Sequence, residues 1–303
     1  MKTALLIGGS GFIGSNLAKA LAKEYQVRIA DLRPPMEIQH LENVVYIPLI
    51  LGAVPNYSEM LKGVDIVFYL AGGLLPEDDT QNFEDDFVSD LFPVIQLLEN
   101  MKSFEKKRLF YFSSGGTVYG DTNGLNKEDQ QLKPSCKYAL LKATAENLMT
   151  VYNNMHNMEA FTIRLSNPYG DRVRSNQRQG IIPILVDAIY NDKPFTVWGN
   201  GENIRDYIYI NDVVNGVLSL ISYNGTNRIF NIGTGQGCSI NDVVSIVEKS
   251  VGRTYNKLQY GDARKCDLLS SVLDTSLITE CTGWKAETTI ENGVKYLLEQ
   301  YDA

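Results

Sequence analysis

The sequence predicts an α/β fold, in which a doubly wound parallel sheet is followed by a smaller C-terminal lobe. The first observation is a series of short apolar runs, of the kind found in strands that are buried on both faces. The second is the spacing between these runs, which leaves room for the crossover helices that parallel strands require. The predicted strands are Ala4–Ile7, Val27–Ala30, Val44–Ile47, Ile66–Ala71, Leu109–Phe112 and Phe161–Leu165.

Helical patterns fill several of the gaps between these runs. The segment Phe12–Lys23 carries its apolar residues on one stripe, which is typical of a helix packed on a sheet. Two further helices are predicted at Asp85–Met101 and Ser135–Tyr152. Pro93 should kink the first of these two, because proline cannot donate a backbone hydrogen bond.

The pattern loosens after about residue 167, where the predicted elements are shorter. Asn211 is expected to cap one helix, and Ser239 and Asp242 form a capping-box variant that opens another. The predicted elements are a helix Ile181–Tyr190, a strand Ile204–Ile210, a helix from Asn211 to Tyr223, a strand Arg228–Ile232, a helix from Ser239 to Val251 and a helix Thr289–Tyr301.

Bulk composition narrows the class of protein. The 303 residues are 44% hydrophobic and 21% charged, which is ordinary for a folded globular protein. The net charge of −8 argues against nucleic acid or an anionic membrane as the main partner. The first apolar stretch is too short for a signal peptide, and no run is long enough to cross a membrane. We therefore expect a cytoplasmic protein with no membrane partner.

The cysteines and histidines form no pattern typical of a metal site or a disulfide framework. No two cysteines make a C-x-x-C pair, and the two histidines are far apart in the sequence. We expect reduced cysteines and no bound metal. The residues concerned are Cys136, Cys238, Cys266, Cys281, His40 and His156.

A glycine-rich turn follows the first predicted strand and opens the first helix. Its glycines are Gly8, Gly11 and Gly14, in the spacing G-x-x-G-x-x-G. Glycine lets the backbone approach a pyrophosphate closely, and the following helix N-terminus, with Phe12 and Ile13, offers free N–H groups to the phosphates. The strand–turn–helix context predicts a dinucleotide site.

Asp31 lies at the end of the second predicted strand, a position expected to discriminate between NAD and NADP. A carboxylate at this place binds the ribose hydroxyls and repels a 2′-phosphate, which favours NAD over NADP. Arg33 follows two residues later and is a residue that could meet a 2′-phosphate, so NADP stays the alternative.

Tyr138 and Lys142 are four residues apart on a predicted helix, so their side chains share one face. A phenol can take a proton from a substrate hydroxyl, but its ordinary pKa is near ~10. A neighbouring ammonium and the positive charge of a nicotinamide stabilise the phenolate, so we expect the pKa of Tyr138 to be lowered. The segment Ser113–Gly120 ends the fifth predicted strand, at the sheet edge where chemistry takes place, and its hydroxyls are candidates to bond the reacting oxygen.

At these residues the sequence resembles the NDP-sugar epimerase/dehydratase family of extended short-chain dehydrogenases, whose nucleotide-binding half is a Rossmann fold. UDP-glucose 4-epimerase is the most similar type. The resemblance covers nearly the whole chain. It rests on the glycine turn 8–14, Tyr69–Gly72, Ser113–Gly120, the Tyr138/Lys142 pair, Arg164–Gly170, Arg205–Ile208, Asn231–Gly235 and Ser271–Asp274.

The resemblance implies roles for individual residues. Tyr138 would be the base, and Lys142 would lower its pKa and hold the nicotinamide ribose. Asn167, Arg205 and Arg264 would bind the sugar diphosphate, which gives an acidic protein a local positive charge for an anionic substrate. The residues expected to bind NAD are Gly8, Gly11, Phe12, Ile13, Gly14, Asp31, Leu70, Ala71, Gly72, Ser113, Tyr138 and Lys142.

The resemblance also divides the chain between these roles. The NAD-binding domain is expected to comprise residues 1–166, with 207–237 returning to it. The nucleotide-sugar lobe is expected to comprise residues 167–206 and 238–303. The family further implies a homodimer formed through the helices near 85–101 and 135–152.

Several positions depart from the family pattern. Gly115 stands where the family has its catalytic Ser or Thr, so Ser114, or less favourably Thr117, must supply that hydroxyl. Tyr69 replaces a frequent His, and Asp90 replaces a common Asn. Leu49-Ile50 lacks the acidic residue often found near the adenine.

The departures also exclude branches of the family. A 4,6-dehydratase needs an Asp-Glu pair where Gly116 and Thr117 stand, and the decarboxylase branch needs a Glu at Thr117. The Cys and His added in fucose-synthase-like enzymes have no obvious counterpart. Our leading hypothesis is therefore NAD-dependent C4 epimerisation of a nucleotide-diphosphate sugar, most simply a UDP-hexose. The alternatives are an NAD(P)-dependent 4-ketoreductase or dehydrogenase of such sugars and a non-catalytic NAD-binding sensor.

Overall fold

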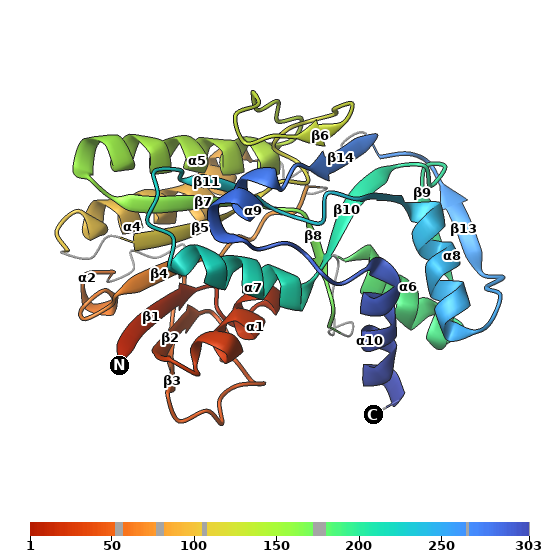
Figure 1. Cartoon of the computed structure of the whole chain (residues 1–303), viewed down its shortest axis with the longest axis horizontal. Coiled ribbons are helices and arrows are strands. Elements are labelled where there is room, and N and C mark those ends of the chain that lie inside the picture. The colour runs from red at the N-terminus through yellow and green to blue at the C-terminus, as the bar shows by residue number, and fades with distance from the viewer. Residues whose placement is uncertain (52–56, 77–81, 105–107, 172–179, 265–266, 303) are drawn as a thin grey trace. The chain divides into compact units, whose positions relative to one another are not determined.

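The computed structural model describes residues 1–51, 57–76, 82–104, 108–171, 180–264 and 267–302 (Figure 1). The chain forms two compact units, each built from several segments. Unit 1 comprises Met1–Ser114, Pro134–Arg164 and Thr226–Phe230. Unit 2 comprises Gly115–Lys133, Leu165–Gly225 and Asn231–Ala303. Which unit binds the cofactor and which binds the substrate stays a prediction.

The largest sheet has seven strands in the order β11-β7-β5-β4-β1-β2-β3. The pairs β1–β2, β2–β3, β1–β4 and β4–β5 are parallel, as the apolar runs predicted. The α/β class with a doubly wound parallel sheet is therefore confirmed. The strands are β1 Lys2–Ile7, β2 Tyr25–Asp31, β3 Val44–Pro48, β4 Ile66–Tyr69, β5 Arg108–Ser114, β7 Glu159–Leu165 and β11 Ile229–Ile232.

The helices predicted for the first half are all present in unit 1. The expected break near Pro93 is a π-helical turn, η1, directly before α4, and Pro93 itself lies in the first turn of α4, where a missing N–H costs little. The elements are α1 Phe12–Leu21, α2 Tyr57–Met60, α3 Phe83–Asp86, η1 Phe87–Leu91, α4 Phe92–Met101 and α5 Lys137–His156.

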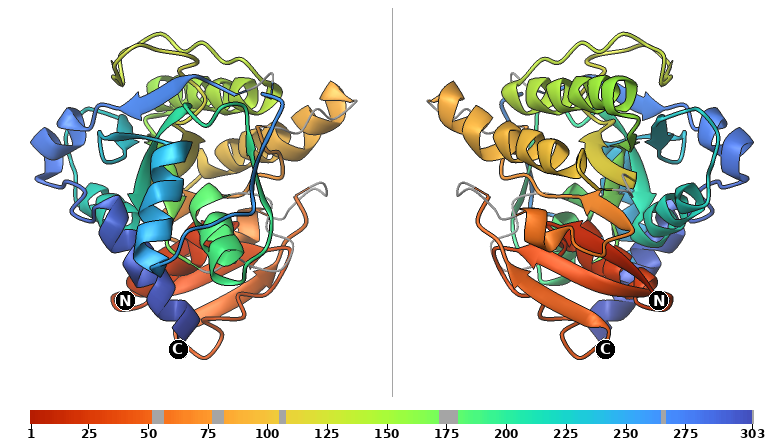
Figure 2. Two further views of the ribbon diagram at one scale, coloured as in Figure 1. Left: turned by 90° about the vertical axis from the view of Figure 1, so that its right-hand side faces the viewer. Right: turned by 90° about the vertical axis from the view of Figure 1, so that its left-hand side faces the viewer.

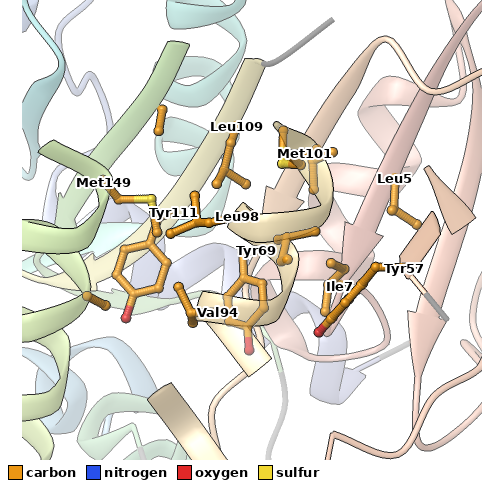
Figure 3. Close-up of a cluster of buried hydrophobic side chains, with 14 of the residues drawn as sticks. Leu5, Ile7, Tyr57, Tyr69, Val94, Leu98, Met101, Leu109, Tyr111 and Met149 are labelled. Atoms are coloured by element: carbon orange, nitrogen blue, oxygen red, sulfur yellow. The ribbon is translucent and has the colours of Figure 1, made fainter. Parts of the chain in front are cut away.

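The core of unit 1 lies between the sheet and the helices α2, α4 and α5 (Figure 3). Alternate residues of β4 and β5 point to opposite faces, so Tyr69 and Tyr111 stack on this side with ring centroids 5.9 Å apart. Phe68 and Phe110 stack on the other side at 5.3 Å. Helix α1 contacts β1 and β2 and contributes no residue to the core that α2, α4 and α5 cover. Both faces of the sheet are thus apolar.

Unit 2 contains several strands too short to show a hydrophobic period. A five-stranded sheet has the order β12-β10-β14-β6, with β8 also paired to β10, and β13 pairs with β9 in a separate ribbon. The strands are β6 Leu125–Asn126, β8 Asn167–Tyr169, β9 Phe195–Trp198, β10 Ile204–Tyr209, β12 Gly237–Ser239, β13 Leu258–Gly261 and β14 Ser270–Leu273. The helices are α6 Ile181–Tyr190, α7 Ile210–Ile221, α8 Ile240–Val251, α9 Ser276–Thr282 and α10 Ile290–Asp302.

One of the two predicted helix caps in unit 2 is confirmed. Ser239 and Asp242 form a full capping box at the start of α8. The expected cap at Asn211 is wrong, because β10 runs directly into α7 and the N-cap is Tyr209, whose side chain makes no capping bond. The polar side chain that suggested the cap already lies inside the first turn.

Candidate active site

The glycine-rich turn joins β1 to α1 and packs tightly against the end of β4. Gly8 has φ +81°, and a Cβ there would lie 2.5 Å from the backbone nitrogen of Ala71. A Cβ at Gly14 would lie 2.6 Å from the Cα of Gly9. These two positions therefore have no room for a side chain.

The middle glycine of the motif, Gly11, faces open space. A Cβ at Gly11 would meet only the carbonyl oxygen of Gly8, at 3.5 Å. Gly11 is the N-cap of α1, and the first bond into the helix is donated by Ser15 to the Gly11 carbonyl, at 2.9 Å. The amides of Phe12 and Ile13 thus have no partner within the helix. An open cradle with free N–H groups fits the diphosphate of NAD.

Asp31, at the end of β2, is tied to the glycine turn. Its Oδ2 accepts a hydrogen bond from the Ser10 N–H at 2.9 Å, and its Oδ1 accepts one from the Arg33 N–H at 3.3 Å. The Ser10 hydroxyl in turn donates to the Arg33 carbonyl at 2.6 Å. These bonds hold the carboxylate beside the turn, where the ribose of a dinucleotide is expected.

A small pocket lies at the carboxyl ends of β4 and β5. It contains both members of the predicted tyrosine–lysine pair and two of the three residues expected to bind the cofactor after β4. It is lined by Ala71, Gly72, Leu74, Asp90, Tyr111, Tyr138, Leu141 and Lys142.

Lys142 is fixed in this pocket by backbone and aromatic groups. Its Nζ donates to the carbonyl oxygen of Phe112 at 2.9 Å. The same atom lies 5.0 Å from the ring centroid of Tyr111 and 5.8 Å from that of Tyr138. Both members of the pair lie at the start of α5, so the helix sets their separation.

The hydroxyls around Tyr138 have different surroundings. Ser114 forms a side-chain hydrogen bond with Tyr138. Ser113 instead donates to Glu146, a buried carboxylate that also accepts two bonds from Arg164 at 2.9 and 2.7 Å. The Ser113 hydroxyl thus bonds a buried carboxylate, and its expected contact with NAD stays a prediction.

Thr117, the second candidate for the missing hydroxyl, belongs to unit 2. Its Oγ1 is buried and has no hydrogen-bond partner among the residues that the structure describes. Gly115 donates its N–H to the Leu165 carbonyl and has no side chain to offer. Of the two candidates, only Ser114 bonds Tyr138 in the described chain.

Burial dominates the titration of the pair. Desolvation raises the pKa of Tyr138, and the hydrogen bond from Ser114 opposes this rise. Desolvation lowers the pKa of Lys142 to about 8, and the carboxylates of Asp90 and Glu146 oppose that fall. The lowered pKa of Tyr138 that the Tyr138/Lys142 spacing predicted is therefore not produced by the groups of this chain alone. The positive charge of a bound nicotinamide would have to lower this pKa further.

The residues expected to bind the sugar diphosphate all lie in unit 2. Asn167 on β8 donates from Nδ2 to the carbonyl of Asp206 at 3.1 Å, and Arg205 precedes Asp206 on the paired strand β10. Arg264 follows β13, and its guanidinium carbon lies 4.9 Å from the ring centroid of Trp198 on β9. The structure therefore brings Asn167 and Arg205 onto neighbouring strands and places Arg264 beside the β9–β13 ribbon.

Asp206 is a residue whose importance the sequence did not reveal. It is fully buried, and its carboxylate accepts bonds from Thr234 N (2.9 Å), Thr234 Oγ1 (2.7 Å), Gly235 N (3.1 Å) and Leu273 N (3.3 Å). Three separate motifs thus meet on one side chain. Arg205–Ile208, Asn231–Gly235 and Ser271–Asp274 were each part of the family resemblance. Nothing in the sequence shows, however, that these three motifs meet at Asp206.

Other features of the described chain bear on the expected partners. None of its helices is both long and apolar enough to span a bilayer. Within the same residues, no three His, Cys, Asp or Glu side chains gather as metal ligands would. Within the described residues, Cys136, Cys238 and Cys281 take part in no disulfide bond, and Cys266 lies outside those residues.

Known proteins are similar to this chain in sequence and in fold. The chain is 28% identical over 302 residues to a putative UDP-glucose 4-epimerase of Methanocaldococcus jannaschii, which covers 96% of this chain and 95% of that protein. It is 26% identical over 310 residues to dTDP-4-dehydro-6-deoxyglucose reductase of Escherichia coli, covering 97% and 96%. The structure of MoeE5 in complex with UDP-glucuronic acid and NAD matches with a TM-score of 0.90 at 26% identity over 99% of each chain.

The family assignment rests on a match that spans most of the chain. The family model covers residues 4–233, from the first strand through the glycine turn and the Tyr138/Lys142 pair to the Asn231–Gly233 motif. The resemblance inferred from the sequence is thereby confirmed. The chain belongs to the NAD dependent epimerase/dehydratase family.

Proposed function

We propose that this protein is an NAD-dependent epimerase that inverts C4 of a nucleotide-diphosphate sugar, with a UDP-hexose as the first substrate to test. One observation carries the proposal. The Tyr138 hydroxyl, hydrogen-bonded to Ser114, shares an open pocket with the Lys142 ammonium, next to a glycine cradle that fits a dinucleotide. The epimerases among the relatives support the same reaction class.

The residues that would hold NAD lie in unit 1. The cradle at Gly11 and the start of α1 would receive the diphosphate, Asp31 the adenosine ribose, and Lys142 the nicotinamide ribose. Bound NAD supplies a hydride acceptor and later a hydride donor at C4 of the sugar.

Tyr138 would handle the proton of the reaction. As the phenolate, its oxygen takes the proton of the sugar 4-hydroxyl as the C4–H bond breaks, and the Ser114 hydroxyl donates a hydrogen bond toward the reacting oxygen. After the 4-keto sugar has rotated to present its other face, Tyr138 returns the same proton to the keto oxygen. No proton and no hydride is consumed over the cycle, which is the signature of an isomerase.

The sugar diphosphate would be bound by unit 2. Arg205 and Arg264 carry the positive charge that two phosphates require, and the net charge of −8 makes such a local concentration of cations necessary. Asn167, held by the Asp206 carbonyl, would add an amide donor.

The experiment is an interconversion assay. Purified protein with NAD is incubated with UDP-glucose, UDP-N-acetylglucosamine or UDP-glucuronic acid, and the products are separated by chromatography. We expect at least one C4-epimer pair to reach equilibrium without net formation of NADH. Absence of conversion for every pair would refute the proposal.

A second candidate is a 4-ketoreductase of a deoxysugar nucleotide, which the reductase relative of Escherichia coli favours. This enzyme would consume one reduced cofactor for each product. Steady oxidation of NADH or NADPH with a 4-keto sugar nucleotide would support it. A non-catalytic NAD sensor is the third candidate, and a Tyr138→Phe variant separates it because a sensor would keep its partner binding.

The proposal includes a homodimer in the cytoplasm, formed through the helices of unit 1. Apolar side chains remain exposed on the α3–α4 segment and on α5, which run side by side in Figure 2. Phe87 is 40%, Phe92 43%, Val151 46% and Met155 70% exposed. We expect a dimer in analytical ultracentrifugation that a Phe87→Glu substitution dissociates, whereas Val45→Glu, an exposed position on strand β3 outside these helices, should leave the dimer intact. A monomeric wild-type protein would contradict this part.

A further inference from the structure

Asp90 is the acidic residue of the pocket that contains Tyr138 and Lys142. It lies on the π-helical turn η1, and its Oδ1 accepts a hydrogen bond from the Gly73 N–H at 2.9 Å. The Ser89 hydroxyl donates to its Oδ2 at 3.4 Å. Both donors are neutral, so neither compensates the charge of the carboxylate.

Asp90 and Lys142 border the same small space. A side chain at Gly72 would place its Cβ 3.6 Å from Asp90 Oδ1 and 3.7 Å from Lys142 Nζ. Because Gly72 has no side chain, the carboxylate and the ammonium have no protein side chain between them there. Because both atoms lie within 3.7 Å of that one point, they are at most about 7 Å apart, within range of an electrostatic interaction in a partly buried pocket.

The other titratable groups around Lys142 differ from Asp90. Glu146, on α5, is held by two hydrogen bonds from Arg164, so its charge is compensated within the core. Tyr111 and Tyr138 present aromatic rings to the ammonium, and Tyr69 stacks behind Tyr111 (Figure 3). The remaining groups of the cluster are Tyr57 behind Tyr69 and Cys136 beside Tyr138.

We propose that Asp90 is a positioning residue whose carboxylate keeps Lys142 in the ammonium form beside Tyr138, and so sets the alkaline limit of turnover. The statement about turnover rests on the proposed function, whereas the statement about Lys142 does not. An amide at position 90 could make the same bond to Gly73 but could not balance the cation. The acidic side chain thus has an electrostatic role that the backbone bond alone does not require.

The sign of the effect follows from the causes that act on each group. Burial lowers the pKa of Lys142 to about 8, and Asp90 is the largest opposing cause. Asp90 also raises the pKa of Tyr138, but there it is the smallest of the causes. Removing the charge should therefore move the titration of Lys142 to lower pH by more than it moves that of Tyr138.

The experiment compares Asp90→Asn with the wild-type protein in the absence of cofactor. The rate at which acetic anhydride acetylates Lys142 is measured against pH by peptide mass spectrometry, since only the free amine reacts. We expect a midpoint near 8 in the wild type, and a midpoint lower by about one pH unit in Asp90→Asn. Asp90→Glu, which keeps the charge, should stay near the wild type. Asp85→Asn is the matched control, because it removes an exposed carboxylate from the same segment.

An unchanged midpoint in Asp90→Asn, or an equal shift in Asp85→Asn, would overturn the proposal. With active enzyme, the alkaline limb of the kcat–pH profile should move down in Asp90→Asn in parallel with the midpoint. A shifted midpoint with an unmoved alkaline limb would overturn the claim about turnover. If the midpoint shifts but even the wild type converts no sugar nucleotide, the proposed function fails while the assignment of Asp90 to Lys142 stands.

Discussion

The glycine turn of unit 1 and the Asp206 cluster of unit 2 are both rigid, but for opposite reasons. At the turn, Gly8 and Gly14 leave no space for a Cβ, so the backbone is fixed by close contact. At Asp206, a buried carboxylate is surrounded by four donors from two other segments, so the backbone is fixed by hydrogen bonds. The glycine turn thus depends on the absence of side chains at Gly8 and Gly14. The cluster depends on the presence of one carboxylate, that of Asp206.

The largest expected effect is on the hydrogen-bonded cluster. Asp206→Ala leaves the N–H groups of Thr234, Gly235 and Leu273, the last of them buried, without their acceptor, which should cost about 3–5 kcal/mol in the free energy of unfolding. Denaturant unfolding followed by circular dichroism measures it. Asp206→Asn keeps one acceptor oxygen and should lose less. Equal stability of the alanine variant and the wild type would show that the cluster does not hold unit 2 together.

In the glycine turn, two alanine substitutions are expected to differ in their effect on stability. Gly8→Ala forces a methyl group against the Ala71 backbone at positive φ, and should cost about 2–4 kcal/mol. Gly11→Ala meets only the Gly8 carbonyl, at 3.5 Å with φ −72°. Its unfolding free energy should stay within about 0.5 kcal/mol of the wild type.

The same pair separates stability from ligand binding. The methyl of Gly11→Ala occupies the open side of the cradle, so its NAD affinity in calorimetry should fall although its stability does not. If Gly11→Ala bound NAD as the wild type does, the cradle would not be the diphosphate site.

Among the substitutions expected to change stability, the smallest effect concerns the buried cation. The pKa of Lys142 is lowered from 10.5 to about 8 in the folded chain. Below pH 8 the folded protein carries the full cost of a buried ammonium, and this cost fades as pH rises toward 10.5, because only the unfolded chain then keeps the proton. Lys142→Met should therefore raise the unfolding free energy by about 1–3 kcal/mol at pH 7 and by little at pH 10, while abolishing activity. A destabilised variant at pH 7 would contradict the assignment.

The two regions also explain how much the sequence could predict. The parallel strands and α1 were predictable because their signals are local: an apolar run, a helical stripe and four glycines within seven residues. The strands β6, β8 and β12 have only two to three residues each, too few to show a period. The expected cap at Asn211 was wrong because a strand feeds α7 directly.

The side chains of the site divide in the same way. Tyr138 and Lys142 were predictable because one helix fixes their spacing. The convergence on Asp206 was not, since its partners are separated along the chain and meet only through the sheet. The preference for Ser114 over Thr117 was already predicted from the sequence, but the hydrogen bond between Ser114 and Tyr138 was not.

The most direct measurement of the central claim uses a sugar nucleotide labelled at the reacting carbon. Protein with bound NAD is given UDP-glucose deuterated at C4, or the corresponding label in whichever sugar is converted, and the C4 epimer is analysed by mass spectrometry. If one hydride leaves and returns within the Tyr138 pocket, the product retains the deuterium and Tyr138→Phe forms almost none of it. An epimer that has lost the deuterium, or one formed equally well by Tyr138→Phe, would contradict the account.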